Sequence, residues 1–334
     1  MPLDVLSLRS RFPALNALVD GRSPVFVDGP AGTQVPDSVV ESVSAAMVTS
    51  ASNVGGAFPA SRASSETVSV AREAAADLLG GAPDEIVFGP NMTTLTLAFS
   101  RALARTWSPG DRIVLSGLDH DANVTPWAMA AADRGVDVDY AAIRTSDMSL
   151  DLDHMESLLT DRTRLVAVTG ASNTFGTTVD VARVASAAHE VGALCFVDAV
   201  HTAPHTRIDA GVWGVDAVVC SAYKFFGPHV GSMWVRRELL GELHPYKVRP
   251  APSDGPGKFE TGTPSFALLA GYAAAVDYLA SLGTGSDRAT RLDSAFTRIR
   301  VWEETLGRRF LDGSGGRVEL YGRESMDGRV STFA

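Results

Sequence analysis

Two stretches of this sequence, FVDAVH (196–201) and VVCSAYKFFGP (218–228), decide the fold class. Each begins as an apolar run typical of a buried β-strand and then turns polar. The polar residues that follow the two runs are Asp198, His201, Ser221, Tyr223 and Lys224. A buried carboxylate or ammonium is costly without a partner, so one ligand shared by both strand ends would explain the pattern. In a parallel sheet, ligands bind beyond the carboxyl ends of the strands.

Strand-like and helix-like segments alternate on both sides of these stretches. We expect helices at 66–81, 93–107, 122–135, 152–160 and 181–192. We expect strands at 85–89, 111–117, 136–143, 164–173, 193–200, 215–223 and 230–237. Repeated units with Val/Ile/Leu-rich strands predict an α/β fold with a mostly parallel sheet covered by helices on both faces.

The pattern changes from Ser265 onward. Helices are expected at 267–283 and 286–311, followed by strands at 317–322 and 328–334 of a smaller α+β unit. A chain of 334 residues is longer than one core usually supports, so a large domain and a smaller one are expected. We predict an N-terminal segment (1–30) that packs on the small domain, a large domain (31–264), and a linking helix with a partial small domain (265–334).

Composition indicates an ordinary globular protein, with 45% hydrophobic and 20% charged residues. The net charge of -10 does not favour nucleic acid or an anionic membrane as partner. Residues 1–20 lack the apolar core of a signal peptide, and no apolar run is long enough for a membrane span. We therefore expect a cytoplasmic protein.

The two cysteines, Cys195 and Cys220, lie in apolar runs. Two cysteines cannot form a disulfide framework, nor do they alone suggest a metal site, and we expect both thiols to be buried and inert.

Pyridoxal 5′-phosphate (PLP) is one ligand that accounts for both strand ends. A carboxylate such as Asp198 keeps the pyridine nitrogen protonated, and a lysine such as Lys224 holds the aldehyde carbon as an imine. Asp198 alone would fit a helix cap, and Lys224 alone would fit a solvated loop. Together, after successive strands of a βα array, they favour PLP. Lys224 would then also move the substrate α-proton as a general base.

Further segments supply candidate contacts to such a cofactor. Thr93 and Thr94 stand at an expected helix start, where free N–H groups and hydroxyls suit a phosphate, although an ordinary N-cap has the same pattern. Ser221 and Tyr223 add hydroxyl donors. His120, after the 111–117 strand, is placed to stack on the ring. Asn173 is placed to donate to the 3′-oxygen, with a simple Asn turn as the alternative.

Taken in order, these segments resemble the class V aminotransferases of fold type I, most closely the cysteine desulfurase-like and selenocysteine lyase-like branch. The resemblance runs from FVDGPAGTQVP (26–36) to TGTPSFALLAG (261–271). It implies a seven-stranded, mostly parallel sheet, with Lys224 as the Schiff-base residue. The implied cofactor contacts are His120, Asn173, Asp198, His201, Ser221 and Tyr223. ETGTP (260–264) is similar to a segment that reaches the neighbouring subunit's phosphate, so Gly262 and Thr263 imply a homodimer.

Three departures limit what the resemblance implies. Tyr223 stands where the family usually has histidine, and His201 where it usually has glutamine. The family also normally continues past Ala334, into a part that would hold a substrate-binding arginine and a sulfur-accepting cysteine. On this basis the small domain is expected to be truncated.

The leading hypothesis is therefore a PLP-dependent lyase or transferase acting on an amino acid, with Lys224, His120 and Asp198 as catalytic residues. Epimerase or aminotransferase chemistry of the same family is an alternative. A truncated, non-catalytic PLP-binding or scaffold protein is another, motivated by the end of the chain inside an expected strand. A dinucleotide enzyme would need G-x-G-x-x-G at a first strand-to-helix turn, whereas DGSGGR lies near the C-terminus.

Overall fold

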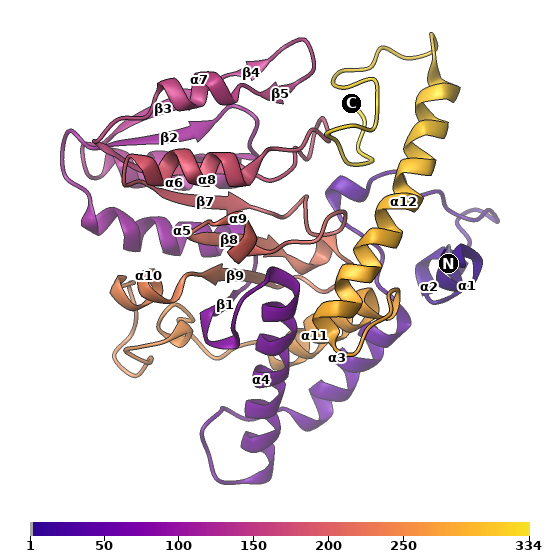
Figure 1. The fold of residues 1–334 in the computed structure, drawn as a ribbon. Coiled ribbons are helices and arrows are strands. Elements are labelled where there is room, and N and C mark those ends of the chain that lie inside the picture. The colour runs from indigo at the N-terminus through magenta and orange to yellow at the C-terminus, as the bar shows by residue number, and fades with distance from the viewer. Residues whose placement is uncertain (1–2) are drawn as a thin grey trace.

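Seven strands form one sheet in the order β1–β9–β8–β7–β6–β2–β3 in the computed structural model, which describes residues 3–334 (Figure 1). Residues 1 and 2 of the predicted N-terminal segment lie outside the described residues. The strands of this sheet are β1 (Ile86–Gly89), β2 (Arg112–Ser116), β3 (Asp137–Ala141), β6 (Thr163–Thr169), β7 (Leu194–Asp198), β8 (Ala217–Ser221) and β9 (Gly231–Val235). A two-stranded hairpin pairs β4 (Ile143–Arg144) with β5 (Ser149–Leu150).

Strands β8, β7, β6, β2 and β3 run parallel to one another, whereas β9 is antiparallel to both of its neighbours, β8 and the edge strand β1. The predicted mostly parallel, seven-stranded sheet is confirmed. Parallel strands require crossover connections, which the intervening helices supply.

Helices lie on both faces of the sheet, and further helices pack on these. In chain order the helices of the described residues are α1 (Val5–Ser10), α2 (Pro13–Asn16), α3 (Asp37–Thr49), α4 (Pro59–Leu79), α5 (Met92–Leu103), α6 (Thr125–Ala132), α7 (Leu152–Ser157), α8 (Val181–Glu190), α9 (Ala210–Trp213), α10 (Arg237–Glu242), α11 (Phe266–Ser281) and α12 (Arg288–Ser314). Successive residues of β7 enter opposite cores: Cys195 and Val197 pack on the side of α4, α8 and α11, and Phe196 packs on the side of α5 and α6. This alternation explains why the strand sequences are apolar throughout.

The helix starts follow from local chemistry. The Asn91 carboxamide accepts from the Thr94 N–H at 2.9 Å and caps α5, and the Asp180 carboxylate accepts from the Arg183 N–H at 3.1 Å and caps α8. Helix α4 begins at Pro59, earlier than the apolar pattern predicts, because proline is already suited to the first turn of a helix.

The strands predicted at 317–322 and 328–334 are wrong. Beyond α12 the chain has no helix or strand, and its Arg329 forms only an isolated bridge with Thr177. A strand needs a continuous partner edge, and here the segment meets a loop instead. In Figure 1 this last part of the chain, in yellow, lies between α12 and the β4–β5 hairpin.

The N-terminal segment contacts the region where the long helices meet the sheet. The Phe12 ring packs edge-to-face on Phe226 and on Tyr278 of α11, with ring centres 5.4 and 5.5 Å apart. Helix α11 also packs against α3, α4 and α12. The domain boundaries at residues 30 and 264 stay predictions.

Candidate active site

The carboxyl ends of β6, β7 and β8 surround a cavity of about 230 Å³. Thr169 and Asp198 are the last residues of β6 and β7 and lie opposite each other in the strand register. Strand β8 ends at Ser221, and the following single turn, Ala222–Lys224, carries Lys224. The cavity is lined by Pro30, Ala31, Met92, Thr93, His120, Ala122, Thr169, Ala171, Asn173, Asp198, Val200, His201, Tyr223 and Lys224.

Asp198 is a buried acid, with 3% of its surface exposed. Its Oδ1 accepts from the Val200 N–H at 2.8 Å, and no other residue among those described donates to the carboxylate. Burial raises the pKa of Asp198 to about 6, against the opposing effect of the His120 and Lys224 charges. The Oδ2 atom is therefore available for a donor from a ligand.

Lys224 is 9% exposed, and its Nζ donates to the backbone carbonyl of Pro30. The ammonium lies 4.8 Å from the centre of the Tyr223 ring. Burial lowers the pKa of Lys224, while the Asp198 charge acts in the opposite direction. A lowered pKa increases the fraction of neutral amine, the form that can act as a nucleophile or a base.

His201 is 4% exposed, and its Nε2 lies 2.8 Å from the hydroxyl of Thr332. Burial, with the His205 and Lys224 charges, lowers the pKa of His201 to about 3. The imidazole is therefore neutral at physiological pH, with one ring nitrogen protonated and the other free to accept.

Most of the residues predicted from the sequence meet in this cavity: Thr93, His120, Asn173, Asp198, His201, Tyr223 and Lys224. The Thr93 backbone N–H has no acceptor among the described residues, as expected at the start of a helix. The His120 Nδ1 accepts from the Ala122 N–H at 3.1 Å. The Tyr223 ring stacks on that of His229 at 4.8 Å.

Four predicted residues do not line the cavity. The Ser221 hydroxyl accepts from the Met92 N–H at 2.9 Å and so ties β8 to the start of α5. Thr94, Gly262 and Thr263 line a second cavity of about 490 Å³ on the other side of that helix start. Gly262 and Thr263 are exposed.

Sequence reasoning missed several residues of the site. Pro30 accepts a hydrogen bond from Lys224, and Thr332 contacts His201, although each pair is remote in sequence. Asp119 was not among the predicted residues, yet burial raises its pKa to about 7, and the Asp198 charge contributes to the rise. The signal for Asp119 was an acidic residue three positions after the end of an apolar strand, β2.

Other classes of site find less support. Among residues 3–334 no group of His, Cys, Asp and Glu side chains is arranged to hold a metal ion. In the same range no helix is long and apolar enough to cross a membrane. The two cysteines are fully buried in β7 and β8, and burial raises the pKa of the Cys220 thiol to about 12.

The open α/β sheet, with a buried aspartate ending β7 and a buried lysine just after β8, defines a fold type I enzyme. The chain matches the aminotransferase class-V family over residues 25–298. It therefore belongs to the class V aminotransferases, a family of PLP-dependent enzymes, within the cysteine desulfurase-like branch.

Individual relatives agree with this placement. An uncharacterized protein of Mycobacterium tuberculosis is 33% identical over 93% of this chain and 76% of its own length. A cysteine desulfurase of Haloferax volcanii is 32% identical over 84% of this chain and 72% of its own. The crystal structure of the Escherichia coli cysteine desulfurase CsdA superposes with a TM-score of 0.82, at 26% identity, over 97% of this chain and 81% of that one.

Proposed function

We propose that this protein is a PLP-dependent enzyme that removes sulfur from cysteine or a closely related amino acid. The observation that carries the proposal is the shared cavity of Asp198 and Lys224, both buried and held at the ends of adjacent strands. Similarity to cysteine desulfurases supports the choice of substrate class.

The residues present fit PLP. The free Oδ2 of Asp198 matches a protonated pyridine nitrogen, and the Lys224 amine matches the aldehyde. The unpaired N–H of Thr93 and the partial positive charge at the start of α5 match the phosphate. We infer that His120 covers one side of the ring and that Asn173 and His201 contact its polar edge.

PLP, when bound, supplies an aldehyde that reacts with amines and a ring that withdraws electrons from the substrate Cα. Lys224 takes the α-proton as its neutral amine and returns a proton to the substrate. Asp198 stays ionised because a positively charged partner favours the carboxylate, which offsets its burial.

Cys195 and Cys220 do not accept sulfur in this proposal; the substrate sulfur passes to an added thiol, and a second thiol group releases it as sulfide with formation of a disulfide. Both are fully buried in strands, and burial raises both thiol pKa values, so little reactive thiolate forms. The homodimer is inferred from the resemblance of ETGTP (260–264) to a segment that reaches a neighbouring subunit, and the exposure of Gly262 and Thr263 is compatible with such a contact. Size-exclusion chromatography with light scattering tests the dimer.

Lys224→Ala tests the proposed function. With PLP, the unmutated protein should show the visible absorbance band of lysine-bound cofactor and release sulfide from L-cysteine in the presence of a thiol reductant. Lys224→Ala should show neither. Lys258→Ala is a matched control, because Lys258 is also buried and donates to a backbone carbonyl, at 3.2 Å, yet lies outside the cavity.

An absorbance band that survives in Lys224→Ala would place the reactive amine elsewhere. Absence of the band in the unmutated protein would contradict PLP binding. A normal band without sulfide or pyruvate from cysteine would contradict the substrate class alone.

A further inference from the structure

The C-terminal segment 323–332 lies along the loop that carries Asn173. The Thr178 N–H donates to the Gly328 carbonyl at 3.0 Å, and the Val330 N–H donates to the Gly176 carbonyl at 2.8 Å. These two bonds attach the segment to one wall of the cavity.

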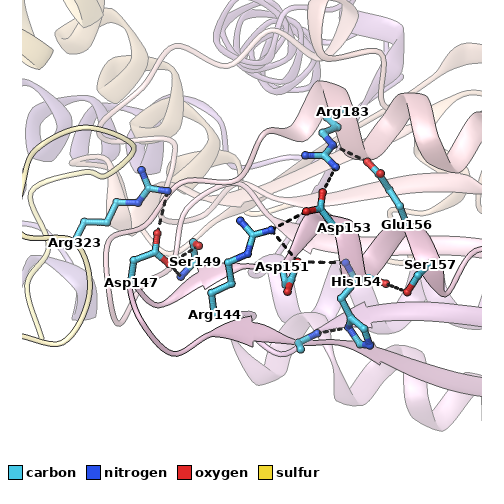
Figure 2. A network of polar contacts seen from close by, with 11 residues as sticks. Arg144, Asp147, Ser149, Asp151, Asp153, His154, Glu156, Ser157, Arg183 and Arg323 are labelled. Carbon is cyan, nitrogen blue, oxygen red and sulfur yellow. Dashed lines mark hydrogen bonds and ion pairs between the residues drawn. The ribbon is translucent and has the colours of Figure 1, made fainter.

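An ion pair holds the beginning of the segment. The Arg323 guanidinium lies 3.3 Å from the Asp147 carboxylate in the β4–β5 hairpin (Figure 2). In the same view Arg144 links this hairpin to α7 through Asp151 and Asp153. Such surface ion pairs are individually weak, so they add little to the stability of the segment's position.

The contact is closest at Gly176, whose φ is +74°. A Cβ there would lie 2.5 Å from the carbonyl oxygen of Thr332 and 2.9 Å from that of Val330. Only glycine permits this approach, which places Thr332 within hydrogen-bond distance of His201.

Thr332 is 5% exposed, and its hydroxyl has one polar partner among the described residues, the Nε2 of His201 at 2.8 Å. A buried hydroxyl left without an acceptor would cost free energy. The arrangement that satisfies the O–H is donation by the hydroxyl to Nε2, which requires an Nε2 without a proton.

A neutral imidazole with an unprotonated Nε2 carries its proton on Nδ1. The groups around the ring are His205, whose ring centre lies 5.1 Å away, and Lys224 and Asp198, which line the same cavity. The Nδ1 of His205 is bound to Glu303 at 2.8 Å, and no hydrogen bond joins His205 to His201 among the described residues.

We propose that Thr332 is a positioning residue that holds His201 in the Nδ1–H tautomer, as a hydrogen-bond donor to the ligand in the cavity. The tautomer is inferred from contacts within the protein alone, and only the identity of the ligand as PLP rests on the proposed function. Because Nε2 is occupied, Nδ1–H is the donor that remains for an oxygen acceptor on the ligand.

Nitrogen-15 NMR of the full chain labelled in histidine tests the tautomer, before and after addition of PLP, with His201→Gln used to assign the signals. The unmutated protein and Thr332→Ser should show a protonated Nδ1, and Thr332→Val should lose this preference. Ser331→Ala is the control, because the Ser331 hydroxyl bonds instead to the Glu303 carbonyl at 3.0 Å.

A protonated Nε2 in the unmutated protein, or an unchanged tautomer in Thr332→Val, would overturn the proposal. As a second readout, PLP affinity from absorbance titration should fall roughly 3- to 10-fold in Thr332→Val and recover in Thr332→Ser. If the NMR result holds while no variant binds PLP, the positioning role stands and the proposed function fails.

Discussion

Replacing Asp198 with asparagine should have two effects of opposite sign. The variant should weaken PLP binding and, in the cofactor-free protein, raise the free energy of unfolding at alkaline pH. Asparagine has nearly the same shape, and its carbonyl can still accept the 2.8 Å bond from the Val200 N–H. The substitution therefore removes the charge and preserves the local geometry.

The stability effect follows from the raised pKa of Asp198. Its folded-state pKa of about 6 exceeds the ordinary value of 3.8, so the folded state binds this proton more tightly than the unfolded state does. Stability from the protonated acid is complete below the unfolded-state pKa and is lost as the pH rises through 6. At about 1.4 kcal/mol per pKa unit, the loss is about 3 kcal/mol by pH 8.

The Asp198→Asn variant does not undergo this pH-dependent loss of stability, because asparagine does not ionise. Urea unfolding at pH 4 and pH 8, without PLP, should show a smaller decline for the variant than for the unmutated protein. Asp119, whose pKa is raised to about 7, contributes a decline of its own, and because the Asp198 charge adds to that rise, this decline is also smaller in the variant. Asp133→Asn, at an exposed position, controls for the change in net charge.

The binding effect follows from losing a charged hydrogen bond to the cofactor. Such bonds contribute about 1.5–3 kcal/mol, so PLP affinity at pH 8 should fall roughly 10- to 100-fold. If the stability of the two proteins declined equally with pH, the claim that burial raises the pKa of Asp198 would be refuted. Unchanged PLP affinity would show that the pyridine nitrogen has another partner.

Two further substitutions test the C-terminal contact and the cysteines. Gly176→Ala should lower the free energy of unfolding, measured in urea, by about 2–4 kcal/mol, because it adds a clash with the Thr332 carbonyl to the strain of a positive φ. Gly214→Ala is the control: its φ is +68° but the space around it is open, so the loss should be only about 1–2 kcal/mol. Equal losses in the two variants would contradict the close contact at Gly176. Cys195→Ala and Cys220→Ala should each retain sulfide release from cysteine, and its abolition by either change would show that a buried thiol takes part.

The pattern of the sequence was enough to predict the class of fold and the centre of the site. Apolar runs of strand length between helical periods predict a covered parallel sheet, because both faces of each strand must be buried. Asp198 and Lys224 stand out locally, because ionisable groups directly after such runs need a partner. Those features depend on neighbours in the chain.

Contacts between distant segments were decided by the tertiary structure. Nothing in the sequence links Thr332 to His201 or Pro30 to Lys224, because each pair meets only after the chain has folded. The C-terminal strands failed to form for the same reason: β-propensity is local, but a strand exists only where a partner edge is presented.

The start of α5 shows the difference between what the sequence predicts and what the tertiary structure decides. The sequence indicated Thr93 and Thr94 together as candidates for a phosphate site, yet Thr93 lines the small cavity and Thr94 lines the other. One residue along a helix turns the side chain by about 100°, as 3.6 residues per turn require. Composition and spacing therefore identify the helix start as a candidate site, whereas the orientation of that helix on the sheet decides which of its residues lines the small cavity.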